Sequence, residues 1–231
     1  MRAAILGAMK EEVESLVSAM AVDEVKEKAG KTVYLGSLRG CPVAVVQCGV
    51  GKVAAAGVAQ LVISEFGATH VFNTGLAGGL KKGIKVGDVV LSTETEYFDV
   101  TPASVLKNNF PAGGRYIADK HLLALAQKAV SSLGLSGIAH EGLVTTGDAF
   151  ITESAEKAKL LQKTTGVCND MEGGAIAQIC HGNGAPFLIV RIISDLADDT
   201  AVDTYYDFKA KAPKLCNDVI CELVAYLGQE A

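Results

Sequence analysis

Three carboxylates stand where the sequence predicts that a buried strand has just ended. Glu12 lies in a helix that follows the apolar segment 3–6, Glu172 begins an apolar helical face, and Asp195 ends the apolar run 186–193. In open α/β sheets the ligand binds beyond the carboxyl ends of the strands. Carboxyl groups at that place can donate or accept protons during catalysis. The sequence therefore indicates a ligand cleft that holds several acids.

Each of these acids also has a structural interpretation. Glu12 flanks the apolar stripe of its helix, so it either borders a cleft or complements the helix dipole. Glu172 precedes a Gly-Gly pair, which admits either a ligand or a closely packed neighbour. Asp195 is followed by a loop-like segment, 196–200, which favours chemistry over a helix N-cap. Arg191, in the middle of the same strand, either neutralises a buried carboxylate or orients a water molecule.

Two glycine-rich segments also follow predicted strands. Residues 48–54 contain G-x-G-x-x-A before a helix, the loose form of the dinucleotide fingerprint, but no acid follows at the spacing that binds a ribose. Residues 73–80 can offer backbone N–H groups to a ligand. No Walker A motif occurs. Both segments are equally compatible with tight strand-to-helix turns.

Short β-rich runs alternate with longer helical patterns, which predicts an α/β fold with a mixed, mostly parallel central sheet flanked by helices. The expected strands are 3–6, 32–38, 43–48, 70–73, 89–91, 142–145 and 187–193, and the expected helices are 10–20, 52–66, 120–133, 154–161, 171–180 and 206–227. Residues 97–116 are interpreted as a long irregular loop, functional or mobile. Residues 1–231 are expected to form a single domain.

Composition excludes several classes of partner. The chain has 231 residues, 49% of them hydrophobic, which is enough for a core without disulfide or metal staples. A net charge of −5 provides no field that would hold a nucleic acid or an anionic membrane. Apolar runs fall far short of the roughly 20 residues that span a bilayer. A small-molecule partner is expected.

Cysteine and histidine usage bears on compartment and metal binding. The six cysteines form no C-x-x-C pair and lie mostly among apolar residues, so we interpret them as reduced core residues. The four histidines form no close pair, so no metal site is expected. The apolar stretch at the start of the chain is too short for a signal peptide. A cytoplasmic protein is expected.

Taken together, seven segments resemble the 5′-methylthioadenosine/S-adenosylhomocysteine nucleosidases of the nucleoside phosphorylase superfamily. They are Gly7-Ala8-Met9 with Glu11-Glu12, residues 48–54, Asn73-Thr74-Gly75 with Ala77-Gly78-Gly79, Lys85-Val86-Gly87-Asp88, residues 147–151, Asp170-Met171-Glu172, and Arg191 with Ile193-Ser194-Asp195. They occur in family order over nearly the whole chain. The resemblance implies a nucleoside phosphorylase-like fold, a homodimer with a shared active site, no cofactor, and hydrolysis of the N-glycosidic bond of 5′-thio-substituted adenosines.

The resemblance also implies roles for individual residues. Asp195 would be the general acid that protonates adenine N7, Glu12 would accept a proton from the attacking water, and Glu172 would hold the ribose 2′ and 3′ hydroxyls. Phe150 would stack on the adenine, and the Ile151 backbone would read its Watson–Crick edge. The other residues that it places around the substrate are Met9, Val50, Ala77, Gly78, Met171, Arg191, Ser194 and Tyr205. Paired carboxyl groups suit a reaction that passes through an oxocarbenium-like sugar.

Three departures from the family pattern stand out. Leu76 occupies a position where the family usually has Ser, and Asp170 replaces a Glu. The segment 100–114 does not match the family's aromatics, which usually cover the 5′ substituent from the neighbouring subunit. These differences bear on which 5′ group is preferred.

Three alternative functions remain at this point. One is a purine nucleoside phosphorylase of the same superfamily, which would need cationic or hydroxyl groups around phosphate where this chain offers Met9, Glu12 and Leu76. A second is an NAD-dependent oxidoreductase or nucleotide-binding module that uses residues 49–51. A third is a nucleoside-binding protein without catalytic activity. The acidic character of the expected cleft favours hydrolysis.

Overall fold

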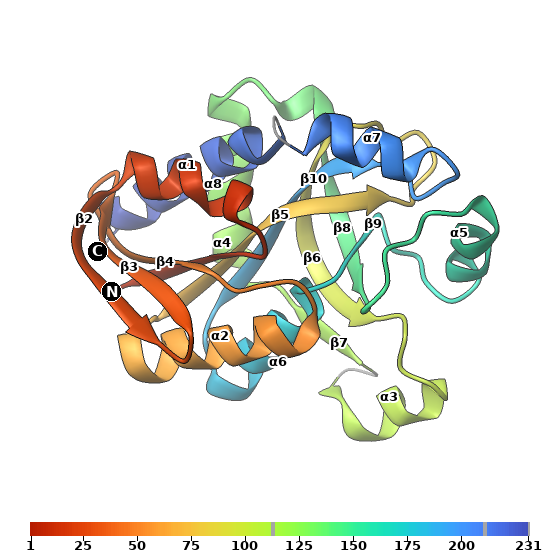
Figure 1. Ribbon diagram of the computed structural model, residues 1–231, viewed down its shortest axis with the longest axis horizontal. Helices are drawn as coiled ribbons and strands as arrows, with labels where there is room; N and C mark the ends of the chain where they lie inside the picture. Colours follow the sequence, from red (N-terminus) through yellow and green to blue (C-terminus); the bar gives the residue numbers. More distant parts are fainter. Residues whose placement is uncertain (112–113, 210–211, 231) are drawn as a thin grey trace.

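Parallel strands form the centre of the molecule (Figure 1). Strand β1 (Ala3–Gly7) pairs in parallel with β4 (Cys41–Gln47) and with β5 (His70–Gly79), and β10 (Phe187–Asp195) pairs in parallel with the other edge of β5. Every residue of β1 and β10 is buried, as expected for strands covered on both faces. The computed structural model describes residues 1–111, 114–209 and 212–230.

Strand β5 belongs to two parts of the sheet. On one side, β10 pairs with β6 (Val89–Tyr97), which leads through β8 (Ala139–Thr146) and β9 (Cys168–Asp170) back to β5, so these strands close a ring. On the other side, the sheet stays open and runs through β1 and β4 to the antiparallel strands β3 (Lys31–Leu38) and β2 (Ala21–Lys28). Strand β7 (Arg115–Ile117) pairs antiparallel with β6.

Helices cover both faces of the sheet (Figure 1). On one face α1 (Lys10–Ala19) and α4 (Lys120–Ser132) pack against α8 (Ala212–Gln229), and on the other α2 (Lys52–Phe66) packs against α6 (Gly173–Asn183). The remaining helices are α3 (Ala103–Asn109), α5 (Ser154–Leu161), α7 (Ala201–Phe208) and a short 3₁₀ turn, Ser136–Ile138. The predicted α/β fold with a mixed sheet flanked by helices is confirmed. In the ranges that the structure describes, none of the helices combines the length and the apolar character needed to cross a membrane.

The glycine-rich segment after Asn73 is strand rather than turn, which corrects the sequence analysis. Strand β5 continues to Gly79 because β10 runs beside it, with Arg191 opposite Gly75 and Asp195 opposite Gly78. A Cβ on Gly75 would lie 2.7 Å from Glu12 Oε1 and 2.9 Å from Arg191 Nη1. Glycine is therefore needed here because two functional side chains cross the strand.

Residues 97–116 were expected to be an irregular loop, and this expectation was wrong. The segment contains helix α3 and the start of β7, although residues 112 and 113 lie outside the described part of the chain. Phe110 packs its ring against Tyr97 at a centroid distance of 6.0 Å, which ties the end of α3 to the core. Helix α3 projects from the body of the molecule (Figure 1).

Two further elements differ from the sequence analysis. The expected helix 206–227 is divided into α7 and α8, and the junction falls at residues 210 and 211, outside the described ranges. Strand β2 was missed because all eight of its residues are exposed, so it lacks the buried face that gives a strand its alternating pattern. Helix α7 matters for the site because it carries Tyr205 and Tyr206.

Candidate active site

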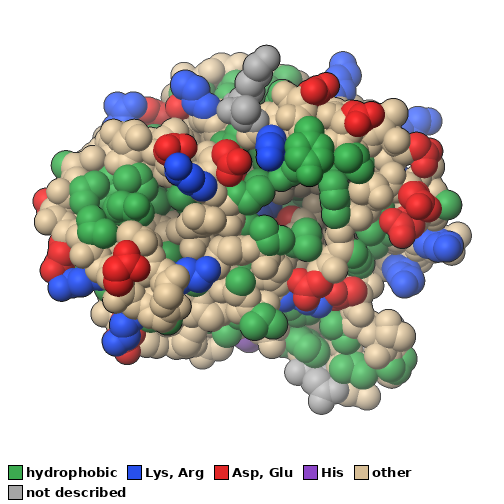
Figure 2. All heavy atoms as spheres, in the orientation of Figure 1, with side chains coloured by type: hydrophobic (Ala, Val, Ile, Leu, Met, Phe, Trp, Pro, Cys, Tyr) green, Lys and Arg blue, Asp and Glu red, His purple; other side chains and the backbone are tan. Residues whose placement is uncertain are grey.

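A cavity of about 210 Å³ opens at the carboxyl ends of β1, β5 and β10, where the sequence analysis predicted a ligand cleft (Figure 2). Eleven of the thirteen predicted site residues line it: Met9, Glu12, Val50, Ala77, Gly78, Phe150, Met171, Glu172, Ser194, Asp195 and Tyr205. These residues come from seven separate stretches of the chain. The sheet therefore gathers most of the predicted site in one place.

Asp195 lies at one end of this cavity and is almost fully buried. The pairing of β10 with β5 is irregular between Ile193 and Asp195, a bulge that places Asp195 opposite Gly78. Its Oδ1 accepts the Ala197 N–H at 2.9 Å and its Oδ2 accepts the Ser194 hydroxyl at 2.8 Å. Burial raises the pKa of the Asp195 carboxyl, although these hydrogen bonds oppose the shift. The next helix begins at Ala201, so Asp195 is not a helix N-cap.

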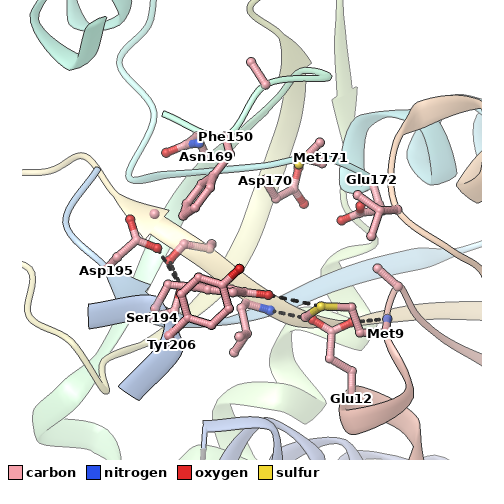
Figure 3. Close-up of a pocket in the computed structure, with 17 residues that line it drawn as sticks. Met9, Glu12, Phe150, Asn169, Asp170, Met171, Glu172, Ser194, Asp195 and Tyr206 are labelled. Carbon is pink, nitrogen blue, oxygen red and sulfur yellow. Dashed lines mark hydrogen bonds between the residues drawn. The ribbon is translucent and has the colours of Figure 1, made fainter. Parts of the chain in front are cut away.

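Glu12 lies at the opposite end of the cavity (Figure 3). It is in the first turn of α1, and its Oε2 accepts the Met9 N–H at 2.9 Å while Oε1 accepts the Leu76 N–H of β5 at 3.1 Å. Burial raises the pKa of the Glu12 carboxyl, and the charge of Arg191 opposes that shift. Glu12 thus caps its own helix and borders the cavity, so both interpretations of this residue describe its geometry.

Arg191 is buried behind the cavity and binds a carboxylate. Its Nε and Nη2 lie 3.0 and 2.5 Å from Asp170 Oδ2, and Nη2 also donates to Asn73 Oδ1. Burial alone would lower the pKa of Arg191, but the carboxylates of Asp170, Glu172 and Glu12 reverse the shift and raise it. One buried cation therefore compensates for several acids beneath the cavity.

Glu172 links this charged cluster to the glycine-rich turn 49–51. It stands at the N-cap of α6, its Oε1 accepts the Gly51 N–H at 2.9 Å, and its Oε2 lies 3.7 Å from Arg191 Nη2. Burial raises the pKa of the Glu172 carboxyl, while Arg191 opposes the shift. The turn that resembled a dinucleotide fingerprint thus directs the Gly51 N–H to a carboxylate of the protein itself.

Aromatic and sulfur-containing side chains form the outer wall of the cavity. The rings of Phe150 and Tyr205 lie 5.4 Å apart, and the Tyr205 hydroxyl lies 3.1 Å from Met9 Sδ. Phe150 is 43% exposed and Tyr206 is 62% exposed, so this wall continues onto the surface. Asp195, Asn169 and Phe150 gather at one end of the cavity, whereas Met9, Glu12 and Glu172 lie toward the other (Figure 3). The arrangement suits a flat apolar group at the first end and a polar group at the second.

Comparison with known proteins places the chain in a family. The family model described as the phosphorylase superfamily matches residues 2–225. The chain belongs to the phosphorylase superfamily. A 5′-methylthioadenosine/S-adenosylhomocysteine nucleosidase of Actinobacillus succinogenes is 38% identical over 98% of this chain and 100% of its own length. The resemblance that the motifs indicated is therefore confirmed.

Solved structures from the same superfamily share the whole fold. The nucleosidase of Neisseria meningitidis in complex with methylthio-immucillin-A has a TM-score of 0.92 and 34% identity, with 97% of this chain and 99% of that chain covered. The nucleosidase of Colwellia psychrerythraea in complex with adenine has a TM-score of 0.91 and 34% identity, with 98% and 96% covered. The nucleoside phosphorylase-like fold expected from the motifs is confirmed.

Two predicted site residues of this phosphorylase-superfamily chain do not line the cavity. Arg191 was expected to bind substrate, but its guanidinium is held by Asp170, which corresponds to the neutralising role considered for it. The Ile151 side chain packs with Leu80, Leu160 and Ala197, and the expected contact of its backbone with adenine stays a prediction.

Four lining residues were not predicted as site residues, although the first two lie within motifs that the sequence analysis noted: Ala8, Ala149, Asn169 and Tyr206. Leu76 and Asp170, which the analysis noted as departures from the family, also line the cavity. A signal for Asn169 was present, since it is a polar residue between the buried Cys168 and the Asp170-Met171-Glu172 motif. Tyr206 has the weaker signal of adjacency to Tyr205.

Proposed function

We propose that this protein hydrolyses the N-glycosidic bond of 5′-thio-substituted adenosines, such as methylthioadenosine and adenosylhomocysteine, releasing adenine and the thio-ribose. One observation carries the proposal: a single cavity holds a buried acid, Asp195, at one end and two buried acids, Glu12 and Glu172, toward the other. Glycosidic hydrolysis needs an acid at the leaving group and a base near water. The names of the relatives support the same reaction and substrate class.

Asp195 serves as the general acid in this proposal. Cleavage of the C1′–N9 bond pushes electrons into the purine, and protonation of N7 makes the base a better leaving group. Burial raises the pKa of Asp195, which favours the protonated form that can donate. Ser194 and the Ala197 N–H fix the carboxyl group, so the proton is presented in one direction.

Glu12 serves as the base for the attacking water. The N–H groups of Met9 and Leu76 hold its two oxygens, and each oxygen keeps a lone pair that can accept a proton from water. A raised pKa makes the Glu12 carboxylate more basic. The developing positive charge on the sugar is stabilised by the same carboxylate.

Glu172 binds the ribose hydroxyls in this proposal. Its Oε1 is anchored by Gly51, and Oε2 is attracted by Arg191. A carboxylate fixed in this way accepts hydrogen bonds from two vicinal hydroxyl groups, and Met171 lies beside it in the cavity wall. Phe150 stacks on the adenine at the Asp195 end. Water is the nucleophile, and the reaction requires no cofactor.

Hydrolysis is favoured over phosphorolysis by the charge of the cavity. Among the lining residues that the structure describes, Glu12, Asp170, Glu172 and Asp195 are acidic and none is Lys, Arg or His. Phosphate carries negative charge and would be repelled unless cationic donors surrounded it. The buried cation nearest to the cavity, Arg191, already binds Asp170.

The test is incubation with methylthioadenosine in phosphate-free buffer, with free base and sugar separated by chromatography. Adenine and 5-methylthioribose are expected in equal amounts. Strict dependence on added phosphate, with a sugar 1-phosphate as product, would contradict hydrolysis. Tight binding of the nucleoside with no release of adenine would contradict catalysis.

We further propose that the active unit is a homodimer whose partner subunit covers the cavity with its segment 100–114. The support is apolar side chains at the cavity that the single chain leaves exposed: Val50 is 55% and Tyr206 62% exposed. Light scattering at assay concentration is expected to give twice the chain mass of 23.9 kDa. An active monomer would contradict a shared site.

The cytoplasm is the compartment that we propose. All six cysteines are buried and free, and burial raises the pKa of Cys48 and Cys180 to about 12. Unpaired thiols in this number are typical of a reducing compartment. Fractionation of the native host, followed by an activity assay of each fraction, tests the assignment. Activity confined to an extracytoplasmic fraction would contradict it.

A further inference from the structure

Asn169 carries a buried polar atom that nothing in the described protein satisfies. The residue lies on β9 opposite Gly78 of β5, is only 4% exposed, and lines the cavity. Its Oδ1 is buried without a hydrogen-bond partner among the described residues. A buried amide oxygen without a partner destabilises the fold, so its presence in a ligand cavity indicates that the ligand supplies the partner.

The position of Asn169 shows which part of a ligand it faces. A Cβ on Gly78 would lie 2.7 Å from Asn169 Oδ1 and 3.1 Å from Asp195 Oδ1, so both oxygens border the space above this glycine. Asn169, Asp195 and Phe150 lie at the same end of the cavity, away from Glu12 and Glu172 (Figure 3). Under the proposed function this is the end that binds the purine base.

The chemistry of a carboxamide then limits what it can recognise. Purine N7 shares one edge of the ring with the substituent at C6, which is a donor in adenine and an acceptor in hypoxanthine. Asp195 is assigned to N7, so the neighbouring Asn169 is placed to meet the C6 substituent. A carboxamide has both an acceptor oxygen and a donor nitrogen, and a half-turn of the amide exchanges the two.

We propose that Asn169 is a specificity-determining residue that hydrogen-bonds the C6 substituent of the purine, and that its carboxamide lets the site hydrolyse 6-oxopurine as well as 6-aminopurine 5′-thionucleosides. This inference rests on the proposed function, because that function places the base at the Asp195 end. With a 6-amino base the amide oxygen accepts. With a 6-oxo base the amide turns over and its nitrogen donates.

The experiment compares the wild type with Asn169→Asp and Asn169→Leu on methylthioadenosine and on methylthioinosine. A carboxylate accepts but does not donate, so Asn169→Asp is expected to lower kcat/KM for the 6-oxo substrate about ten-fold or more relative to the 6-amino substrate. Asn169→Leu removes both functions and is expected to lower kcat/KM for each substrate about five-fold, with the ratio between substrates little changed. The new carboxylate changes the surroundings of Asp195 for both substrates alike, so this effect cancels in the ratio of the two kcat/KM values.

Stability provides an independent readout that separates recognition from folding. Asn169→Leu replaces a buried amide whose oxygen is unsatisfied with an apolar side chain of similar volume, so its Tm without ligand is expected to equal or exceed that of the wild type. A merely structural asparagine would instead lose stability on this substitution. If Asn169→Asp fails to fold, Asn169→Leu with 5′-methylthio-purine riboside, which lacks a C6 substituent, tests the same contact: the substitution is expected to lower kcat/KM for that substrate less than it lowers kcat/KM for methylthioadenosine.

Three results would overturn the inference, and they differ from failure of the proposed function. Release of adenine from methylthioadenosine by the wild type, with no hypoxanthine released from methylthioinosine, would remove the extended substrate class. An unchanged substrate ratio in Asn169→Asp would remove the contact with C6, and so would full activity of Asn169→Leu on both substrates. If the wild type releases no base from either nucleoside, the proposed function itself fails, and this inference fails with it.

Discussion

The two ends of the cavity differ in how completely the protein satisfies its own polar groups. At the Glu12 end, both carboxylate oxygens accept backbone N–H groups, Glu172 is anchored by Gly51, and Arg191 neutralises Asp170 beneath them. At the Asp195 end, Asn169 Oδ1 has no partner within the described chain and Phe150 is 43% exposed. The first end is fixed before a ligand arrives, whereas the second is completed by one.

This difference follows from the sheet. The fixed end lies where β1, β5 and β10 run in parallel, so strand N–H groups and a buried arginine are available to hold the acids. At the other end Asp195 closes β10, but the rest is built by the three-residue strand β9 and by the segment after β8, which leave Asn169 Oδ1 without a partner among the described residues. Rigidly held carboxylates suit the sugar, where water attacks, and an adaptable end suits the choice of base.

The largest effect is expected from Asp195→Asn at the adaptable end. The amide can keep the hydrogen bond from the Ala197 N–H and can donate to Ser194 Oγ, so the fold is expected to remain. It cannot deliver a proton to N7, and general acids contribute roughly 10²- to 10⁴-fold. Steady-state kinetics should show kcat lowered by that factor. Near wild-type turnover would mean that another group protonates the base.

The same variant tests the pKa of Asp195 through stability. A carboxyl whose pKa is raised in the folded state keeps its proton longer than it does in the unfolded chain. Its contribution is therefore fully present below the ordinary value of 3.8 and is lost as the pH rises through the raised value. The Tm of Asp195→Asn relative to the wild type is expected to be higher at pH 7 than at pH 4. A difference that does not change with pH would contradict a raised pKa.

At the fixed end, Arg191→Met is expected to cost about 3 to 5 kcal/mol of unfolding free energy, because it leaves Asp170 buried and without its cation. Urea denaturation measures the loss. The double variant Arg191→Met with Asp170→Asn is the control, since removing the charge of the partner should recover part of it. Equal stabilities for the single and double variants would show that the ion pair does not hold this end together.

Gly75→Ala perturbs the fixed end more gently. The new methyl group would lie 2.7 Å from Glu12 Oε1, so the carboxylate must leave its position, at about 1 to 3 kcal/mol of unfolding free energy. Activity should fall as well, because Glu12 is the proposed base. Gly57→Ala is the matched control: it lies in α2 with no atom within 4 Å of the added methyl, and it should stabilise by about 0.8 kcal/mol. Similar behaviour of the two variants would contradict the close approach.

The smallest effect is expected from Leu76→Ser, between the two ends. Leu76 lines the cavity and donates its N–H to Glu12, and a serine hydroxyl would add one hydrogen bond near the ribose and water. A neutral hydrogen bond is worth about 1 kcal/mol, so kcat/KM should rise a few-fold on methylthioadenosine and on adenosylhomocysteine alike. A loss on both substrates would show that the pocket is built around the leucine, and it would count against the substrate assignment.

The sequence predicted the fixed end better than the adaptable one. Glu12 and Glu172 were identified because each follows an apolar strand or opens an apolar helical face, and at the adaptable end only Asp195 gave a comparable signal. The ion pair of Arg191 with Asp170 was left open between two roles, because these residues are 21 positions apart and only the folded sheet brings them together. Asn169 was missed because its place beside the Asp170-Met171-Glu172 motif is a weak signal, and an unsatisfied oxygen is a property of packing rather than of a motif.

Secondary structure was mispredicted where tertiary contacts override local propensity. The Gly-rich end of β5 has low strand propensity and is held as a strand by β10 and by the side chains that cross it. Strand β9 has three residues, too few for a periodic pattern. Helix α3 lies among Pro and Gly residues that are typical of loops, and contacts of Leu106 and Phe110 with the core hold it.

The buried cysteines can report how often the structure around the site opens. Cys48 adjoins the turn that binds Glu172, Cys168 neighbours Asn169, and Cys216 Sγ lies 3.0 Å from the hydroxyl of Thr74 in β5. Because burial raises the pKa of Cys48 to about 12 and that of Cys216 to about 11, these thiols react with alkylating reagents only when the structure opens. The rate of alkylation therefore measures how often the sheet around the cavity opens, and no foreign label has to be introduced into the protein.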